Sequence, residues 1–193
     1  GDGDPSGVGP WAEELLGEAK PEVIYNTATG FTADTFEQVT AADPTQIIAV
    51  NQAVDARTKG SLEEIAPTTV KPNGYEDWQV PWEKQVETIA DAVGKENEGD
   101  KLIDDTEKAF EEFRHEHAEL QDKSAAIVMP YDGKIGLYTK EDGRGQFIED
   151  LGMEIPDALQ GDGGSFFVDI APENYAKLNQ VDYLFVLDYN GSS

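Results

Sequence analysis

The chain has 193 residues, enough for one large or two small domains with a hydrophobic core. Its 40 acidic residues against 14 basic ones give a formal net charge of -26, which argues against duplex nucleic acid and anionic lipid as partners, because both need clustered Lys and Arg. The absence of cysteine excludes disulfides, thiolate nucleophiles and cysteine-based zinc sites, and no segment approaches the roughly 20 apolar residues of a membrane-spanning helix.

The first half of the chain alternates short apolar runs with helical segments. The predicted strands are 22–25, 46–50 and 68–70, and the predicted helices are 32–42, 61–66 and 86–93. Pro67 ends one of these helices, and Gly94 follows another in the left-handed position that favours glycine. Strand, helix and strand within about 30 residues indicate a right-handed βαβ unit with a parallel sheet. We therefore expect an N-terminal α/β lobe over residues 1–95.

Residues 96–122 are predicted to join two lobes through one long helix, 96–120. At about 1.5 Å per residue such a helix reaches roughly 37 Å, more than a small domain. Its apolar residues fall on one narrow stripe, which consists of Leu102, Ile103, Thr106, Ala109, Phe110, Phe113 and Leu120. The pattern fits either a coiled-coil arm or a strut along two lobes. The strut is favoured because an α/β pattern resumes directly after the helix.

Residues 123–193 are predicted to form a second α/β lobe. The expected strands are 125–129 and 183–187, both buried, and 134–139. The expected helices are 145–151 and 172–178, and 131–133 and 162–164 are expected as turn and loop. The fold class is thus α/β, with mainly parallel sheets in two lobes and one linking helix. Both ends of the chain look cut, so we expect partial lobes from a longer secreted protein.

Three consecutive features carry a family resemblance. They are Ile65-Ala66-Pro67-Thr68 with Val70, the tryptophan-bearing loop that follows, and Ile89-Ala90 with Ala92-Val93-Gly94-Lys95-Glu96. This order resembles the ferric-siderophore-binding proteins of ABC transporters, which have two α/β lobes bridged by one helix. The resemblance implies a monomeric, extracytoplasmic protein, lipid-anchored at the outer face of the cell membrane. It would capture an Fe(III)-siderophore complex and deliver it to the permease. The siderophore would coordinate the iron, so no resident metal or cofactor is expected.

Glu37 and Glu173 occupy matching places, each predicted in the first turn of a helix that leads into a buried strand. They align with the family's segments E-x-I-x-x-L-x-P-D-L-I and S-x-E-x-L-x-x-x-x-A-D-x-x-x-V, although Thr45-Gln46 replaces the usual Asp-Leu. The resemblance implies that both glutamates lie at the outer tips of the lobes and pair with arginines of the permease. Local roles are the alternative: Glu37 completes a capping box after Asp34, and Glu173 complements a helix dipole.

The ligand site is expected between the lobes, at the carboxyl ends of strands. A bulky and often anionic chelate needs aromatic walls and an arginine that faces its oxygen atoms. The chosen candidates are Asn51, Arg57, Trp78, Tyr131, Tyr138 and Arg144. Purely structural roles stay open for the aromatic residues, as does a solvated position for Arg144, and the Phe166-Phe167 pair fits a half-buried strand.

Other functions find less support. Cobalamin or haem binding in the same fold needs an axial or edge ligand, and the two histidines, His115 and His117, are misplaced for that on the long helix. They lie about 200° apart around its axis, so they cannot share a metal either. A calcium-binding surface module is suggested by EF-hand spacing from Asp2 to Glu13, although Pro5 and the lack of a preceding helix oppose it. Enzymatic activity is not expected, because the chain has no G-x-S-x-G, phosphate-loop or dinucleotide motif.

Overall fold

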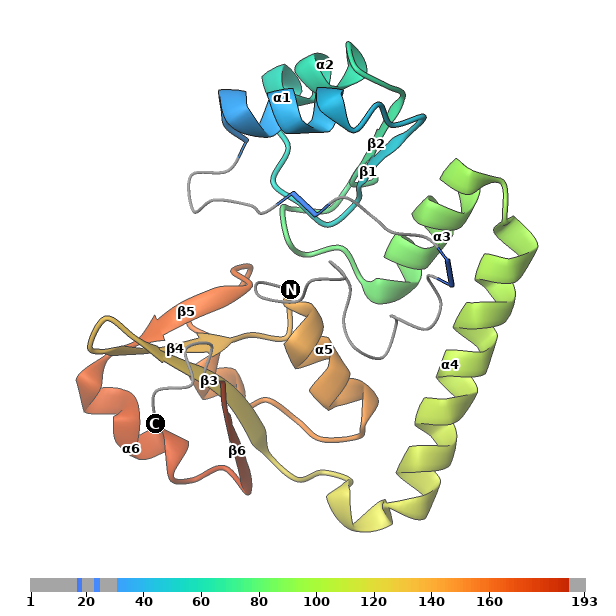
Figure 1. Cartoon of the computed structure of the whole chain (residues 1–193). Helices are drawn as coiled ribbons and strands as arrows, with labels where there is room; N and C mark the ends of the chain where they lie inside the picture. Colours follow the sequence, from blue (N-terminus) through green and yellow to red (C-terminus); the bar gives the residue numbers. More distant parts are fainter. Residues whose placement is uncertain (1–16, 19–22, 25–30, 188–193) are drawn as a thin grey trace. The chain divides into compact units, whose positions relative to one another are not determined.

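The computed structural model describes residues 17–18, 23–24 and 31–187, and its contacts divide the chain into two compact units (Figure 1). Unit 1 consists of Gly1–Ala49 and Val54–Thr69, and unit 2 consists of Val50–Ala53 and Val70–Ser193. The α/β fold class is confirmed, whereas the lobe boundaries at residues 95 and 122 stay a prediction. The predicted calcium loop from Asp2 to Glu13 lies outside the described residues.

Unit 1 contains two helices and a two-stranded sheet. Its elements are α1 (Ala33–Ala41), β1 (Ile47–Ala49), α2 (Ala56–Glu63) and β2 (Thr68–Val70), whose last residue passes into unit 2. These agree with the prediction except at α2, which ends earlier, at Glu63 and not at Pro67, and also begins earlier, because Asp55 accepts a hydrogen bond from the Thr58 N–H (2.7 Å) and caps the helix there. Of the predicted strand 22–25, only residues 23 and 24 are described, and they are not in a strand.

Thr32 caps α1 and forms a capping box with Thr35. The Thr32 hydroxyl oxygen accepts from the Thr35 N–H (3.3 Å), and the Thr32 N–H donates to the Thr35 hydroxyl oxygen (3.4 Å). Glu37 therefore lies beyond the first turn, and the expectation that it completes a capping box with Asp34 is wrong. The box uses two threonines, since their short side chains reach the backbone at this spacing.

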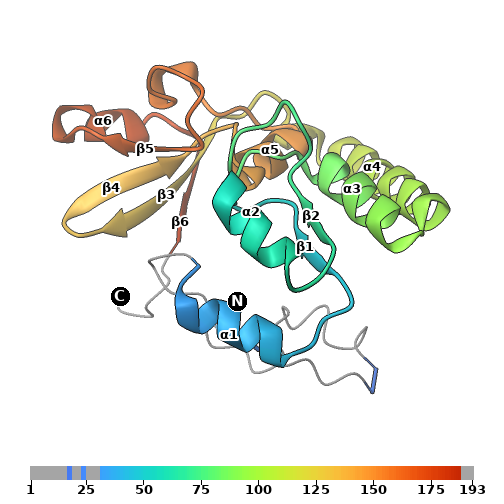
Figure 2. The same ribbon diagram turned by 90° about the horizontal axis from the view of Figure 1, so that it is seen from above.

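Unit 2 begins with a helical hairpin of α3 (Trp82–Val93) and α4 (Glu96–Glu116), which lie side by side (Figure 2). Gly94 joins them in the left-handed conformation (φ 68°, ψ 39°), as predicted. The helices touch where Gly99 faces Ala90: a Cβ at Gly99 would lie only 2.5 Å from that of Ala90. The hairpin therefore depends on the missing side chain at Gly99.

The apolar stripe of α4 is narrower than the sequence suggested. Ile103, Thr106 and Phe110 are partly buried, but Leu102 and Ala109 are exposed and do not belong to the stripe. The regular helix also stops at Glu116, and a short 3-10 turn covers Ala118–Leu120.

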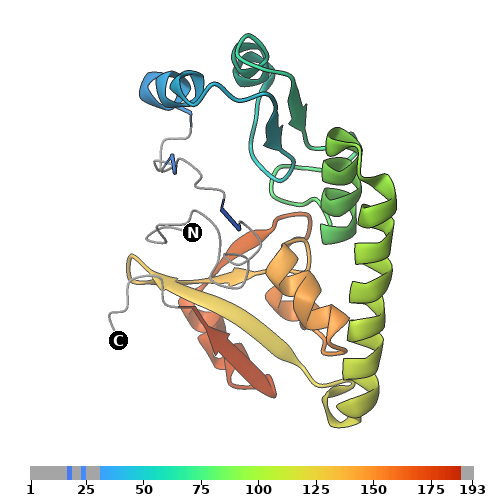
Figure 3. The same ribbon diagram turned by 45° about the vertical axis from the view of Figure 1, so that its right-hand side comes forward.

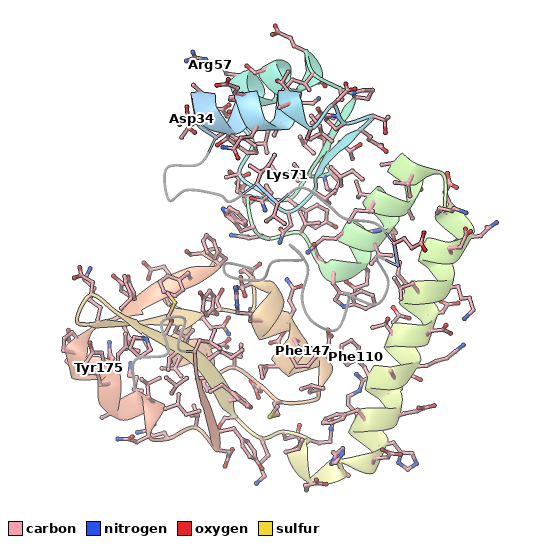
Figure 4. The ribbon with its side chains drawn as sticks, in the orientation of Figure 1. Asp34, Arg57, Lys71, Phe110, Phe147 and Tyr175 are labelled. Atoms are coloured by element: carbon pink, nitrogen blue, oxygen red, sulfur yellow. The ribbon has the colours of Figure 1, made fainter. Side chains whose placement is uncertain are left out.

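Helix α4 is fixed to the rest of unit 2 through α5 (Gly143–Asp150). The Phe110 ring lies 6.3 Å from that of Trp82 and 5.9 Å from that of Phe147, which points toward it from α5 (Figure 4). One turn further on, the Arg114 guanidinium donates to the backbone oxygen of Asp150 (2.6 Å). These contacts rule out a free coiled-coil arm. A bridging role between lobes stays a prediction.

A mixed four-stranded sheet forms the centre of unit 2, in the order β5-β4-β3-β6. Its strands are β3 (Ala125–Tyr131), β4 (Lys134–Tyr138), β5 (Phe167–Ile170) and β6 (Tyr183–Val186). The β3–β4 and β4–β5 pairs are antiparallel, and β3–β6 is parallel. The Phe166-Phe167 pair was expected to fit a half-buried strand, but the sequence did not give the bounds of β5, which follows a glycine-rich loop and pairs with β4 only after a long excursion of the chain.

Alternate residues of the central strands supply two hydrophobic cores. On one face, Ile127 and Tyr138 pack with Ile148 of α5, which lies between the sheet and α4 (Figure 3). On the other face, Val128 and Leu137 pack with residues of the 3-10 turn Asp157–Leu159 and of α6 (Tyr175–Leu178), which follows the 3-10 turn Pro172–Asn174. The alternation follows from the two-residue period of a strand.

Strand β6 is exposed, so the prediction of a buried strand is wrong there. The exposed fraction runs from 40% at Tyr183 to 57% at Val186. In the described part of the chain β6 pairs with β3 alone, at the edge of the sheet, and an edge strand has fewer neighbours to cover its apolar side chains. Among the described helices, none combines the length and apolarity needed to cross a membrane.

Candidate functional site

Three of the six predicted ligand residues meet on one face of the sheet in unit 2. We define the aromatic cluster as Tyr131, Tyr138, Phe167 and Arg144. Phe167 stands opposite Tyr138 in the β4–β5 register, and its ring centre lies 5.0 Å from that of Tyr138 and 5.8 Å from that of Tyr131. Three rings from three strands thus form a continuous aromatic surface.

Gly136 provides the space for the Phe167 ring. A Cβ at Gly136 would lie 2.6 Å from both Cε atoms of this ring and closer still to Cζ. The ring therefore covers the backbone of β4 between the two tyrosines. Any side chain at Gly136 would displace it, since carbon atoms prefer separations of about 3.5–4.0 Å.

The start of α5 holds Arg144 over the aromatic surface. Asp142 caps the helix by accepting from the Arg144 N–H (2.8 Å), and its carboxylate oxygens also accept from the Arg144 guanidinium at 3.1 and 3.2 Å. The guanidinium carbon lies 4.3 Å from the ring centre of Tyr138, a cation–π geometry. A Cβ at Gly145 would meet the Thr139 carbonyl carbon at 2.6 Å, so glycine permits this close approach.

Tyr131 and its neighbours form the other end of the cluster. The Tyr131 hydroxyl donates to Asp169 of β5, and the Lys134 ammonium lies 3.3 Å from the second oxygen of the same carboxylate. The hydrogen bond to the Asp169 carboxylate raises the pKa of Tyr131, and the same bond lowers the pKa of Asp169. Tyr131 therefore stays protonated and works as a hydrogen-bond donor at neutral pH.

The members of the cluster differ in what a ligand could touch. Tyr138 is only 7% exposed, and its hydroxyl lies 3.7 Å from the sulfur of Met129, so it supports the site from beneath. Tyr131 and Phe167 are half-buried, and the Arg144 side chain is 45% exposed. An incoming molecule would meet two aromatic rings and one guanidinium.

Asn51 and Trp78 form a second group in unit 2. The Asn51 side-chain oxygen accepts from the Val80 N–H (3.2 Å), and Gln79 donates through its side-chain amide to the Gly164 backbone oxygen (2.9 Å). These bonds anchor the loop in which Trp78 is exposed and adopts a positive φ of 67°. Positive φ is uncommon for a bulky residue and concentrates where a loop presents a side chain for a function.

Arg57 belongs to unit 1, where it lines a cavity of about 510 Å³ at the neighbouring ends of α1 and α2 (Figure 4). Phe31 and Phe36 line the same cavity, with ring centres 5.8 Å apart. Asp55 is also present, and its pKa is lowered chiefly by the hydrogen bond from the Thr58 N–H, with a smaller effect of Arg57. The cavity thus combines aromatic walls with one cation and one anion.

Both glutamates predicted to contact the permease are exposed. Glu37 lies on α1 of unit 1, and Glu173 lies in the 3-10 turn of unit 2 that precedes α6. Only Glu173 is in the first turn of its helix, so the local alternative of a helix-dipole role applies to it and not to Glu37.

The sequence analysis missed Asp142, Gly136 and Asp169. Asp142 could have been found, since Asp before a helical segment is a capping signal. An isolated glycine within a strand, as at Gly136, signals a close approach by another group. Asp169 had no comparable signal, because its contact with Tyr131 depends on the register between β4 and β5.

Comparison with known proteins now decides the family. The family model described as "Periplasmic binding protein" matches residues 7–192. The chain belongs to this family. The predicted resemblance is thereby confirmed, and so is an extracytoplasmic location, because these proteins bind solutes outside the cytoplasm. No curated protein matches the chain significantly.

Solved structures give the same assignment. The substrate-binding protein PiaA from Streptococcus pneumoniae in complex with ferrichrome has a TM-score of 0.78 and 27% identity, over 96% of this chain and 63% of PiaA. A periplasmic solute binding protein from Mycobacterium smegmatis has a TM-score of 0.78 and 29% identity, over 95% of this chain and 61% of that one. FhuD2 from Staphylococcus aureus with ferrioxamine B, at 22% identity and a TM-score of 0.64, shares the fold. The chain spans less than two thirds of the length of each.

Proposed function

We propose that this chain forms part of an extracytoplasmic solute-binding protein that captures a ferric siderophore and delivers it to an ABC-transporter permease. Its family binds solutes, and its structural relative PiaA is described as an iron uptake protein and was solved with ferrichrome. The observation that carries the proposal is the aromatic cluster, because its half-buried rings and guanidinium suit the outer surface of a metal chelate.

In this proposal the siderophore coordinates the iron and the protein touches only the outside of the complex. Tyr131 and Phe167 pack against the organic frame, while Arg144 donates to the oxygen atoms around the metal. Tyr138 fixes the positions of Arg144 and Phe167 from beneath. The function is capture and not catalysis.

Three further candidates are proposed as ligand contacts, each within its own unit. In unit 2, Trp78 stacks on the ligand from its strained loop, and Asn51 holds that loop through Val80. In unit 1, the place of Arg57 in an aromatic-walled cavity supports its role as a ligand contact.

The proposed delivery step uses Glu37 and Glu173. Both carboxylates are exposed, as contact with arginines of a permease requires, and the capping box of α1 does not involve Glu37. We further propose that the protein acts as a lipid-anchored monomer. Haem or cobalamin binding is not favoured, because the His117 ring packs 4.4 Å from Phe113 and contacts Glu119 at 3.2 Å.

Titration of the chain with ferric chelates tests the proposal. Ferrichrome, ferrioxamine B, a ferric catecholate and ferric citrate are added while tryptophan fluorescence is recorded, and at least one should quench it saturably. Phe167→Ala should weaken that binding by about tenfold, the effect of losing one well-packed aromatic contact. Leu102→Ala, which truncates an exposed residue of α4, is the matched control and should bind as wild type. Failure of every chelate to bind would refute the proposed function.

A further inference from the structure

The charges around the aromatic cluster are balanced. At one end the Arg144 guanidinium contacts the Asp142 carboxylate at 3.1 Å, and at the other the Lys134 ammonium contacts the Asp169 carboxylate at 3.3 Å. Two cations thus face two carboxylates within one surface, which carries no formal excess of positive charge.

The Asp142–Arg144 pair is built into the fold, whereas the Lys134–Asp169 pair is exposed. Asp142 is only 5% exposed and also accepts the Arg144 N–H as the cap of α5, so it cannot turn away from the guanidinium without losing the helix cap. Asp169 accepts from Tyr131 and Lys134 together. The Asp142 carboxylate consequently stays in place when a ligand arrives, and it continues to offset the charge of Arg144.

The whole chain adds to this effect. Its formal net charge of -26 produces a negative field that repels anions and attracts cations. A site for a multiply charged anion in such a protein needs unpaired cations to overcome the field. The cluster instead offers aromatic faces, which attract apolar surface and cationic groups.

Ferric chelates differ in charge according to their donor groups. Each hydroxamate loses one proton when it binds iron, so a complete trihydroxamate complex such as ferrichrome is neutral, and ferrioxamine B adds a cationic amine. Catecholate and citrate complexes retain negative charge. We infer that the aromatic cluster selects neutral or cationic ferric hydroxamates over anionic ferric catecholates and citrates, an inference that rests on the proposed function and adds a substrate class to it.

The first test compares dissociation constants of ferrichrome, ferrioxamine B, a ferric catecholate and ferric citrate for the chain. The two hydroxamates should bind at least about tenfold more tightly than the anionic complexes, since one uncompensated charge near a site is worth this much or more. Anionic complexes that bind as tightly as ferrichrome, or more tightly, would overturn the inference and leave the proposed function standing. Absence of any binding would overturn both.

The second test changes the charge balance. Asp142→Asn keeps a capping side chain but removes the negative charge that contacts the Arg144 guanidinium, so the preference for ferrichrome over ferric citrate should fall by about tenfold. Asp169→Asn frees the Lys134 charge in the same way and replaces the first variant if that one folds poorly. Glu112→Gln on the exposed face of α4 changes the net charge equally and should keep the wild-type preference. An unchanged preference in a folded Asp142 or Asp169 variant would overturn the inference.

Discussion

Substitution of Gly136 by alanine should remove the aromatic surface without touching any polar group. The new Cβ would lie 2.6 Å from both Cε atoms of the Phe167 ring, against a preferred separation of about 3.5–4.0 Å. The ring must therefore retreat by at least about 1 Å. Because Phe167 is only half-buried, it can swing outward, and we expect an overpacking cost of about 1–2 kcal/mol.

The assay combines thermal unfolding with ferrichrome titration. A loss of about 1–2 kcal/mol corresponds to roughly 2–8 °C in Tm for a chain of this size. Chelate binding should weaken along with stability, because the displaced Phe167 ring no longer joins Tyr131 and Tyr138 into one aromatic surface. Gly143→Ala is the matched control, since a Cβ there meets nothing within 4 Å and its φ is ordinary. Wild-type stability and affinity in Gly136→Ala would refute the packing argument.

Two further predictions concern stability. Gly99→Ala should destabilise the chain by about 1–3 kcal/mol, because the added methyl group would lie 2.5 Å from the facing α3 side chain. Gly60→Ala in α2 should instead stabilise the chain by up to about 1 kcal/mol through helix propensity, because the added Cβ meets nothing within 4 Å. Denaturant titration that finds Gly99→Ala more stable than Gly60→Ala would contradict both predictions. Asp150→Asn should raise Tm at neutral pH, because burial raises the pKa of Asp150 and its charge sits at the unfavourable C-terminal end of α5. Because the pKa of Asp150 is higher in the folded than in the unfolded state, wild type loses stability as pH rises between these two pKa values. The higher Tm of Asp150→Asn should therefore vanish below the ordinary Asp pKa, where wild-type Asp150 is protonated in both states. A higher Tm that persists in acid would show that the charge of Asp150 is not its cause.

Local patterns determined most of the elements. Helix α3 and its end at Gly94, the strand pair around 131–133, and α5 follow from hydrophobic period, breakers and capping residues, which act within a few positions of the chain. The family could likewise be predicted from the motif between residues 65 and 96, and the family model confirms it.

The candidate site was predictable only in part. The rule that ligand residues follow strands selected Tyr131, and the scarcity of arginine drew attention to Arg144. The sequence could not reveal that Tyr138 is buried, nor that Phe167 fills the space above Gly136. Those facts depend on the pairing of β4 with β5, whose bounds and register the sequence did not reveal.

The amino-acid sequence by itself determined most of the helices and strands, the acidic character of the chain and its family. Only the tertiary structure decided that β6 lies exposed at a sheet edge, that Leu102 and Ala109 leave the stripe of α4, and that Arg144 of the aromatic cluster and the neighbouring Lys134 each contact a carboxylate. The physical reason is distance along the chain. Propensity and capping act between near neighbours, whereas strand register and ion pairing join residues tens of positions apart and exist only after the chain has folded.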